Sequence, residues 1–265
     1  STQGYSSAAS DVYKRQAIRH AKERLKDYPN LTIVKSSYIN IKSELKKLGI
    51  DKITGGVILD LGASYHQLTK AERGFSFSKE APLDMRFDME SDFSAYDVVN
   101  TYSEDELVRI FSEYGEERFS KRIARKIIEI RRSEPIRTTK ELADIIIAAT
   151  PRIKSHIHPA TRVFQAIRIE VNNELKNVNF VLHDILDLLD KGGIISVISF
   201  HSLEDRIVKQ IFKFESQKCR CNEMICKCPP PRIELVNRKP IMACEKEIME
   251  NPPSRSAKLR VVRAI

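Results

Sequence analysis

Two apolar runs of this chain end at side chains that can do chemistry, and the first ends at an acid. The run Gly56–Leu61 is typical of a buried strand, with Asp60 near its end and Gln67 in the small polar loop beyond. In an open α/β sheet, ligands bind in the crevice at the carboxyl ends of the strands. Asp60 and Gln67 would flank such a crevice. A buried strand with a polar turn explains this segment equally well.

The second run, Ile194–Phe200, leads directly into a cluster of polar side chains. His201, Glu204 and Arg206 follow where a strand becomes a helix. Polar groups are costly to bury unless they bind a ligand or cap a helix. Capping by Ser202, with acids complementing the helix dipole, accounts for part of the cluster but not for His201 and Arg206.

Two further segments carry residue types that bind nucleic acids. Phe77 lies in a loop where aromatic residues alternate with arginines, a pattern that can stack a flipped base and hold phosphate. Taken alone, such a segment is more often a packed loop. Arg162, Gln165 and Arg168 share one face of an expected helix. The two arginines are therefore candidate phosphate contacts.

Four of the five cysteines fall within ten residues. Cys219, Cys221, Cys226 and Cys228 form a C-x-C-x4-C-x-C pattern. Thiolates so close together can bind Zn²⁺ tetrahedrally, although common structural sites use C-x2–4-C spacing. A surface loop of reduced cysteines is the alternative. The pattern does not resemble a secreted disulfide framework, so we expect a reducing, cytoplasmic location.

The charge of the chain favours an anionic partner. The 265 residues carry a formal net charge of +9, and residues 201–265 hold 14 Lys and Arg against 8 Asp and Glu. Nucleic acid is the first candidate partner, although many basic proteins bind none. No apolar run approaches the ~20 residues that span a bilayer, so we expect a soluble protein without a membrane partner.

The pattern along the chain predicts an α/β domain that is interrupted by helices. Residues 1–16 are rich in Ser and Ala and resemble an unrelated or disordered tail. The α/β pattern covers 17–91 and 181–265, and the segment between, 92–180, is almost continuously helical. Expected helices lie near 17–28, 39–48, 104–113, 116–132, 138–149, 160–189 and 203–214, with strands near 31–34, 56–61, 194–200, 232–236 and 258–265. Ser103 and Glu106 have the spacing of a capping box.

Several short segments match one protein family in order and spacing. They are Leu59–Gly62, Glu72–Phe77, Pro82–Arg86, Tyr114–Glu116, His158–Arg162, Ile198–Arg206, and Asn251–Pro252 with Arg255–Arg260. Together, from about Ala17 to Ile265, they closely resemble the MraW-type family of ribosomal RNA methyltransferases. The resemblance implies a class I (Rossmann-like) α/β sheet that uses S-adenosylmethionine and methylates N4 of a cytidine in 16S rRNA of the small ribosomal subunit. The helical segment 92–180 is then an inserted substrate-recognition subdomain, and a homodimer is left open.

The resemblance also assigns roles to residues that match the family. Tyr38, Asp60 and Gln67 fall on cofactor contacts. Asp60 would place its carboxylate near the sulfonium or amino group of S-adenosylmethionine, and Tyr38 would stack on the adenine ring. Beyond the resemblance, our own candidates for contact with the base are His201 and Glu204, as catalytic residues, and Phe77. Our candidates for phosphate contact are Arg162, Arg168 and Arg206.

One family feature has no counterpart in the sequence. Family members carry a Gly-Gly-His-containing loop after the first strand and a ribose-binding acid after the second, and Ala17 aligns just downstream of that acid. We therefore expect a class I sheet without its first two strands, in which 31–34 and 56–61 are strands three and four of the order 3-2-1-4-5-7-6. A non-catalytic RNA-binding module is the alternative from another class. A DNA cytosine-N4 methyltransferase is disfavoured, because no Ser-Pro-Pro-Tyr-like motif follows Asp60.

Overall fold

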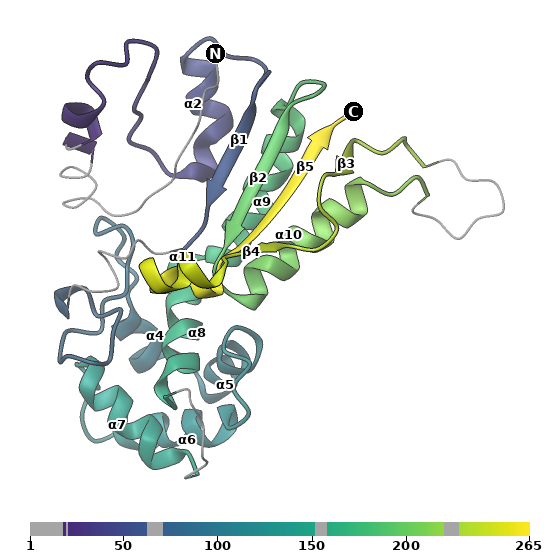
Figure 1. Cartoon of the computed structure of the whole chain (residues 1–265). Coiled ribbons are helices and arrows are strands. Elements are labelled where there is room, and N and C mark those ends of the chain that lie inside the picture. Colours follow the sequence, from purple (N-terminus) through teal and green to yellow (C-terminus); the bar gives the residue numbers. More distant parts are fainter. Residues whose placement is uncertain (1–17, 20, 63–70, 152–157, 220–227) are drawn as a thin grey trace. The chain divides into compact units, whose positions relative to one another are not determined.

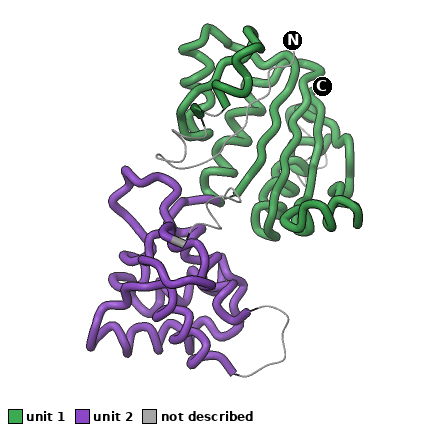
Figure 2. The backbone as a smooth tube through the Cα atoms, turned by 60° about the vertical axis from the view of Figure 1, so that its left-hand side comes forward, with its two compact units in different colours: residues 1–8, 12–62, 175–265 green, residues 9–11, 63–174 purple. Residues whose placement is uncertain are grey.

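The computed structural model describes residues 18–265 except 20, 63–70, 152–157 and 220–227 (Figure 1). Its residues divide into two compact units (Figure 2). Unit 1 holds the described residues up to 62 together with 175–265, and unit 2 holds those between 63 and 174. Within the described ranges, no helix is both long enough and apolar enough to cross a membrane.

Unit 1 is built on a mixed sheet. Its strands are β1 (Gly56–Asp60), β2 (Ile194–Ser199), β3 (Ile233–Leu235), β4 (Ile241–Met242) and β5 (Lys258–Ala264). The order is β1-β2-β5-β3, and β4 pairs with β5 beside this path. β1 and β2 run parallel, whereas β5 is antiparallel to both β2 and β3. This arrangement agrees with strands 4-5-7-6 of the expected sheet order.

Three helices of unit 1 bury apolar side chains in the core beside this sheet: α2 (Ile41–Lys47), α9 (Glu174–Leu188) and α10 (Ser202–Glu215). A fourth helix, α11 (Glu245–Glu250), has no buried residue. Side chains alternate across a strand, so Val57 and Leu59 of β1 face the core while Ile58, which is 52% exposed, does not. Ile185 of α9 and Phe212 of α10 are buried in the same cluster.

The strand expected at Leu31–Val34 is wrong, because these residues adopt no regular structure. Leu31 is 39% exposed and Val34 40% exposed, so the run is not buried either. A short apolar run becomes a strand only when a neighbouring strand satisfies its backbone N–H and C=O groups. Among the described residues, β1 is the last strand of the sheet on this side and pairs with β2 alone.

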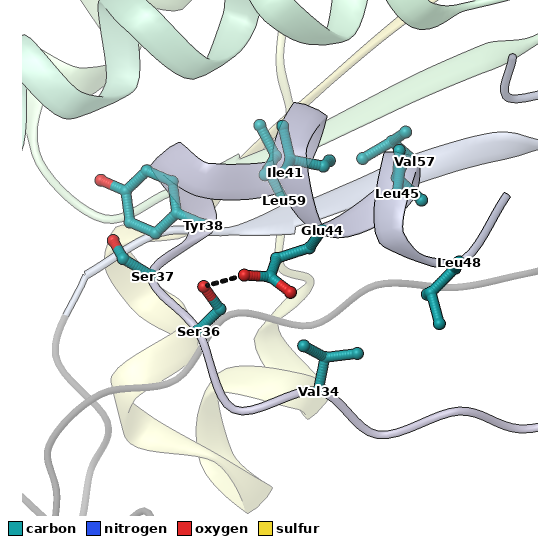
Figure 3. Close-up of a pocket in the computed structure, with 10 residues that line it drawn as sticks. All are labelled: Val34, Ser36, Ser37, Tyr38, Ile41, Glu44, Leu45, Leu48, Val57 and Leu59. Carbon is teal, nitrogen blue, oxygen red and sulfur yellow. Dashed lines mark hydrogen bonds between the residues drawn. The ribbon is translucent and has the colours of Figure 1, made fainter. Parts of the chain in front are cut away.

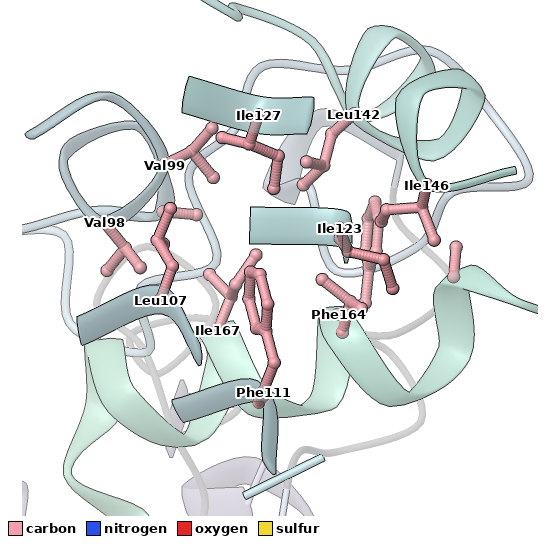
Figure 4. Close-up of a cluster of buried hydrophobic side chains, with 14 of the residues drawn as sticks. Val98, Val99, Leu107, Phe111, Ile123, Ile127, Leu142, Ile146, Phe164 and Ile167 are labelled. Atoms are coloured by element: carbon pink, nitrogen blue, oxygen red, sulfur yellow. The ribbon is translucent and has the colours of Figure 1, made fainter. Parts of the chain in front are cut away.

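Unit 2 is helical and has its own core. Its helices are α4 (Ala95–Thr101), α5 (Glu104–Glu113), α6 (Ser120–Arg131), α7 (Thr139–Ala149) and α8 (Ala160–Asn172). Phe111, Ile123 and Ile146 are fully buried at the centre of this cluster (Figure 4). The predicted capping box is confirmed: Glu106 N donates to Ser103 Oγ at 3.3 Å, and Ser103 N donates to Glu106 Oε2 at 2.8 Å.

The limits of unit 2 differ from the expected segment 92–180. Leu83 and Met85 are buried in the helical core, and Leu83 N donates to Arg137 O at 3.0 Å, so this earlier segment packs with the helices. The single helix expected over 160–189 is wrong. Asn173, with φ +50°, ends α8 in the left-handed conformation that asparagine tolerates. The helix that follows, α9, contributes Val181 to the core of unit 1.

Candidate functional site

The parallel pairing of β1 and β2 places two polar segments at one edge of the sheet. Asp60, the last residue of β1, lies opposite Ile198, so the residues after β2 begin at the same edge. Partial burial raises the pKa of the Asp60 carboxyl, and the negative charge of Glu204 raises it further. The two carboxylates are therefore close enough to interact, at the edge of the sheet where ligands bind in open α/β folds.

His201 and Glu204 form the N-terminal cap of α10. His201 is in the extended conformation, with Glu204 N donating to its Nδ1 at 3.4 Å. In return, Glu204 Oε2 accepts from Phe200 N at 3.0 Å and from His201 N at 3.4 Å. The expected cap at Ser202 is thus wrong, since Ser202 is already the first residue of the helix. Histidine is an unusual cap residue, but Glu204 occupies the position of the acid in a capping box.

The second ring nitrogen of His201 lacks a hydrogen-bond partner. The side chains of His201 and Glu204 are 11% and 1% exposed, and His201 Nε2 lies 3.2 Å from Glu204 Oε1 without hydrogen-bonding geometry. Because Nδ1 accepts from the backbone, the ring N–H is on Nε2. A buried donor with no bond is costly to maintain. The site therefore presents one unused N–H beside carboxylate acceptors.

An ion pair fixes α10 to β5 just behind this cap. Arg260 donates from Nε to Asp205 Oδ1 at 2.7 Å and from Nη2 to Asp205 Oδ2 at 3.2 Å, and Lys258 Nζ lies 3.5 Å from the same carboxylate. Burial alone would raise the pKa of Asp205, but the hydrogen bonds and charge of Arg260 lower it overall. Arg260 lies in one of the segments that resemble the MraW-type family, but the sequence indicated no role for it.

Tyr38 lies in a pocket that is distinct from the carboxylate pair. Tyr38 belongs to a short 3-10 helix, Tyr38–Asn40, and borders an opening between α2 and β1 (Figure 3). The other lining residues are Val34, Ser36, Ser37, Ile41, Glu44, Leu45, Leu48, Val57 and Leu59. Leu59 lines this pocket, and successive side chains of a strand point to opposite faces, so Asp60 is directed away from it. Gln67 lies outside the described residues.

The chemistry of these groups fits S-adenosylmethionine in two respects. The ammonium and sulfonium groups of this molecule are cationic, and a cation would offset the repulsion that raises the pKa of Asp60 beside Glu204. An apolar wall with one aromatic ring, as in the Tyr38 pocket, suits an adenine ring.

Two of the expected RNA contacts form intramolecular contacts in unit 2. The half-buried Phe77 stacks on His158, with centroids 4.4 Å apart, and meets Phe164 edge-on at 5.2 Å, as in a packed loop. Arg168 donates from Nε and Nη2 to the two carboxylate oxygens of Glu174 at 2.8 and 3.0 Å, and the side chains are 17% and 5% exposed.

The other two expected contacts are more accessible. Arg162 Nη1 donates to Glu116 O at 3.0 Å in an exposed bond. Arg206 is exposed on α10. Phosphate binding by Arg162, Arg168 and Arg206 stays a prediction.

The described residues do not support the expected zinc site. Cys219 is exposed and Cys228 is partly buried, whereas Cys221 and Cys226 lie outside the described residues. In the part of the chain that the structure describes, no cluster of metal-ligating side chains contains a cysteine.

A mixed α/β sheet of this order, with polar residues after parallel β1 and β2, fits a methyltransferase fold. Comparison with known proteins shows to which methyltransferase family the chain belongs. The model of the MraW methylase family matches residues 6–265, a range that begins inside the segment expected to be an unrelated tail. The chain belongs to this family.

Several relatives carry the name ribosomal RNA small subunit methyltransferase H. That of Clostridioides difficile (strain 630) is 52% identical over 258 residues, which cover 95% of this chain and 82% of that protein. That of Clostridium botulinum (strain Loch Maree / Type A3) is 53% identical over 253 residues, covering 94% and 82%. That of Geobacter sp. (strain M21) is 51% identical over 256 residues, with the same coverage.

Proposed function

We propose that this chain transfers a methyl group from S-adenosylmethionine to N4 of a cytidine in 16S rRNA. Family membership and the names of its relatives support a small-subunit rRNA methyltransferase. The choice of cytosine rests on one observation: the His201 Nε2–H makes no hydrogen bond and lies beside carboxylate acceptors.

The hydrogen-bonding edge of cytosine complements these groups. Cytosine presents a donor, the N4 amine, next to an acceptor, the ring N3, on its Watson–Crick edge. His201 Nε2–H would donate to N3, while Asp60 or Glu204 would accept from the N4 amine. A base with a carbonyl in place of the N4 amine would put an acceptor opposite the carboxylates. Buried polar groups left unpaired in this way discriminate strongly against the wrong base.

The reaction demands polarisation of a weak nucleophile. The N4 lone pair is delocalised into the ring, so positioning and electrostatic stabilisation carry most of the catalysis. Bound S-adenosylmethionine supplies an electrophilic methyl group. As the new N4–C bond forms and the S–C bond breaks, positive charge develops on N4, and an adjacent carboxylate stabilises it.

The cofactor would be held by groups on unit 1. We assign Asp60 to the cationic end of the molecule and Tyr38 to the adenine ring, with Gln67 as a further contact from the loop after β1.

Methyl transfer from labelled S-adenosylmethionine to isolated small ribosomal subunits tests the proposal. We expect label in 16S rRNA with the wild-type chain and strongly reduced label with Asp60→Ala, a surface change that leaves the core of unit 1 intact. A folded wild-type chain that binds the subunits and S-adenosylmethionine but transfers no methyl group would overturn the proposed activity.

A further inference from the structure

One short segment of unit 2 carries a dense positive charge. Residues 118–132 contain seven Arg and Lys residues and a single acid, Glu129, which gives a local net charge of +6 in a chain of +9. This segment consists of α6 and its two ends. The sequence patterns that identified candidate RNA contacts did not include it.

The packing of α6 directs part of this charge to solvent. One face of the helix, with Ile123 and Ile127, is buried in the core of unit 2 (Figure 4). On the outer face Lys121, Arg122 and Arg125 are exposed, and they are neighbours because residues three and four apart share a face. Arg118, in the turn before α6, is exposed as well. We call these four cations (Arg118, Lys121, Arg122 and Arg125) the α6 ridge.

Two of the three remaining cations of the segment make contacts within the protein. Lys126 pairs with Glu129 at 2.8 Å, and Arg131 donates to the carbonyl oxygens of Val99 and Tyr102. Arg132 follows the last residue of α6 and is exposed, and we do not count it in the cluster of four.

The ridge, in contrast, has little internal compensation. Arg125 Nε lies 3.6 Å from Glu104 Oε1, with side chains 77% and 41% exposed, a solvated pair of small effect. No ion pair of the described residues involves Arg118, Lys121 or Arg122. Like charges three and four residues apart destabilise a helix, and a bound anion would relieve this repulsion.

The composition of the ridge favours phosphate over a protein surface. None of the large hydrophobic side chains that are exposed among the described residues lies on α6. Protein interfaces depend on buried aromatic and aliphatic anchors, whereas contacts to a nucleic-acid backbone depend on Lys and Arg. From Arg118 to Arg125 the ridge is about 10 Å long at the helical rise, which matches about three stacked nucleotides.

We infer that the α6 ridge binds the phosphate backbone of the rRNA substrate. The inference rests on the proposed function, because it takes the rRNA as the ligand. The ridge would supply affinity and orientation without reading the base, since phosphate contacts carry no sequence information.

The test is the salt dependence of binding to a 16S rRNA transcript by Arg118→Gln/Lys121→Gln/Arg122→Gln. Each lost phosphate contact lowers the slope of log affinity against log salt by about 0.7 to 0.9. Between ~50 and ~200 mM salt, the wild-type chain should therefore lose about 20- to 40-fold more affinity than the variant. The matched control is Lys22→Gln/Arg24→Gln/Lys26→Gln, which removes three exposed cations from unit 1.

The outcomes separate the inference from the function on which it rests. We expect the ridge variant to keep its S-adenosylmethionine affinity and its melting temperature, and the control to keep the wild-type salt slope. An unchanged slope in the ridge variant, or an equal loss in the control, would overturn the inference. A loss seen only with assembled subunits and not with naked rRNA would assign the ridge to a ribosomal protein instead. A wild-type chain without affinity for the transcript or the subunits would contradict the proposed function itself.

Discussion

The ion pair between Asp205 and Arg260 should be among the most sensitive points of unit 1. Arg260→Met keeps most of the side-chain volume but removes both hydrogen bonds, at 2.7 and 3.2 Å, from a carboxylate that is 12% exposed. Breaking a buried pair from one side costs about 3–5 kcal/mol, because the other charge stays buried. Lys258 Nζ, at 3.5 Å, compensates only partly, so we expect about 3 kcal/mol.

The assay is hydrogen exchange of the β2 and β5 amides, which measures the opening of unit 1 regardless of unit 2. Arg263→Met is the matched control on the same strand, since Arg263 pairs with Glu234 at 3.0 Å where both side chains are about half exposed. Its cost should stay below about 1 kcal/mol. Equal protection losses in the two variants would refute the reasoning.

The effect of Arg260→Met should also depend on pH. The pKa of Asp205 is lowered from 3.8 in the folded chain, so the pair stabilises the fold above this value and its contribution is lost as pH falls through the lowered pKa. The difference in stability between wild type and variant is therefore largest near neutral pH and shrinks as pH falls towards and below 3.8. A difference that is independent of pH would exclude the ion pair as its cause.

Three further predictions concern individual side chains. His201→Ala should lower the stability of unit 1 by about 1 kcal/mol through loss of the α10 cap, whereas His201→Asn should retain the cap. If both variants lose methyl transfer equally, the imidazole acts on the base. Full activity of His201→Asn would contradict that role. Arg168→Ala should destabilise unit 2 by a few kcal/mol in thermal unfolding, because Glu174 is left buried and unpaired; a variant of wild-type stability with weakened RNA binding would instead make Arg168 a phosphate contact. Glu204→Gln should lower the pKa of Asp60 and move the acidic limb of S-adenosylmethionine binding to lower pH, which calorimetry across pH would measure; an unmoved limb would show that Glu204 does not act on Asp60.

The sequence predicted those elements whose signals are local. The apolar runs that became β1 and β2 and the Ser103–Glu106 capping box each lie within a few residues, and the structure contains all three. Because parallel strands share their carboxyl ends, the polar residues that follow β1 and β2 lie at one edge of the sheet.

The features that the sequence did not predict depend on distant or unusual partners. Asn173 breaks a continuous apolar period by taking a left-handed conformation, which periodicity does not encode. Because of that break, the ion pair between Arg168 and Glu174 could not be predicted from helical spacing: Glu174 begins the next helix and does not share a face with Arg168. Leu31–Val34 has the composition of a strand, but strand formation depends on a neighbour elsewhere in the sheet.

The identity of the methylated nucleoside tests the central claim most directly. Small ribosomal subunits are incubated with the chain and S-adenosylmethionine, and their 16S rRNA is digested to nucleosides for mass spectrometry against standards. The account predicts N4-methylcytidine, formed by the wild-type chain and strongly reduced with Asp60→Ala. Formation of 5-methylcytidine or of a methylated purine in its place would contradict the assignment of Asp60, His201 and Glu204 to the cytosine amine.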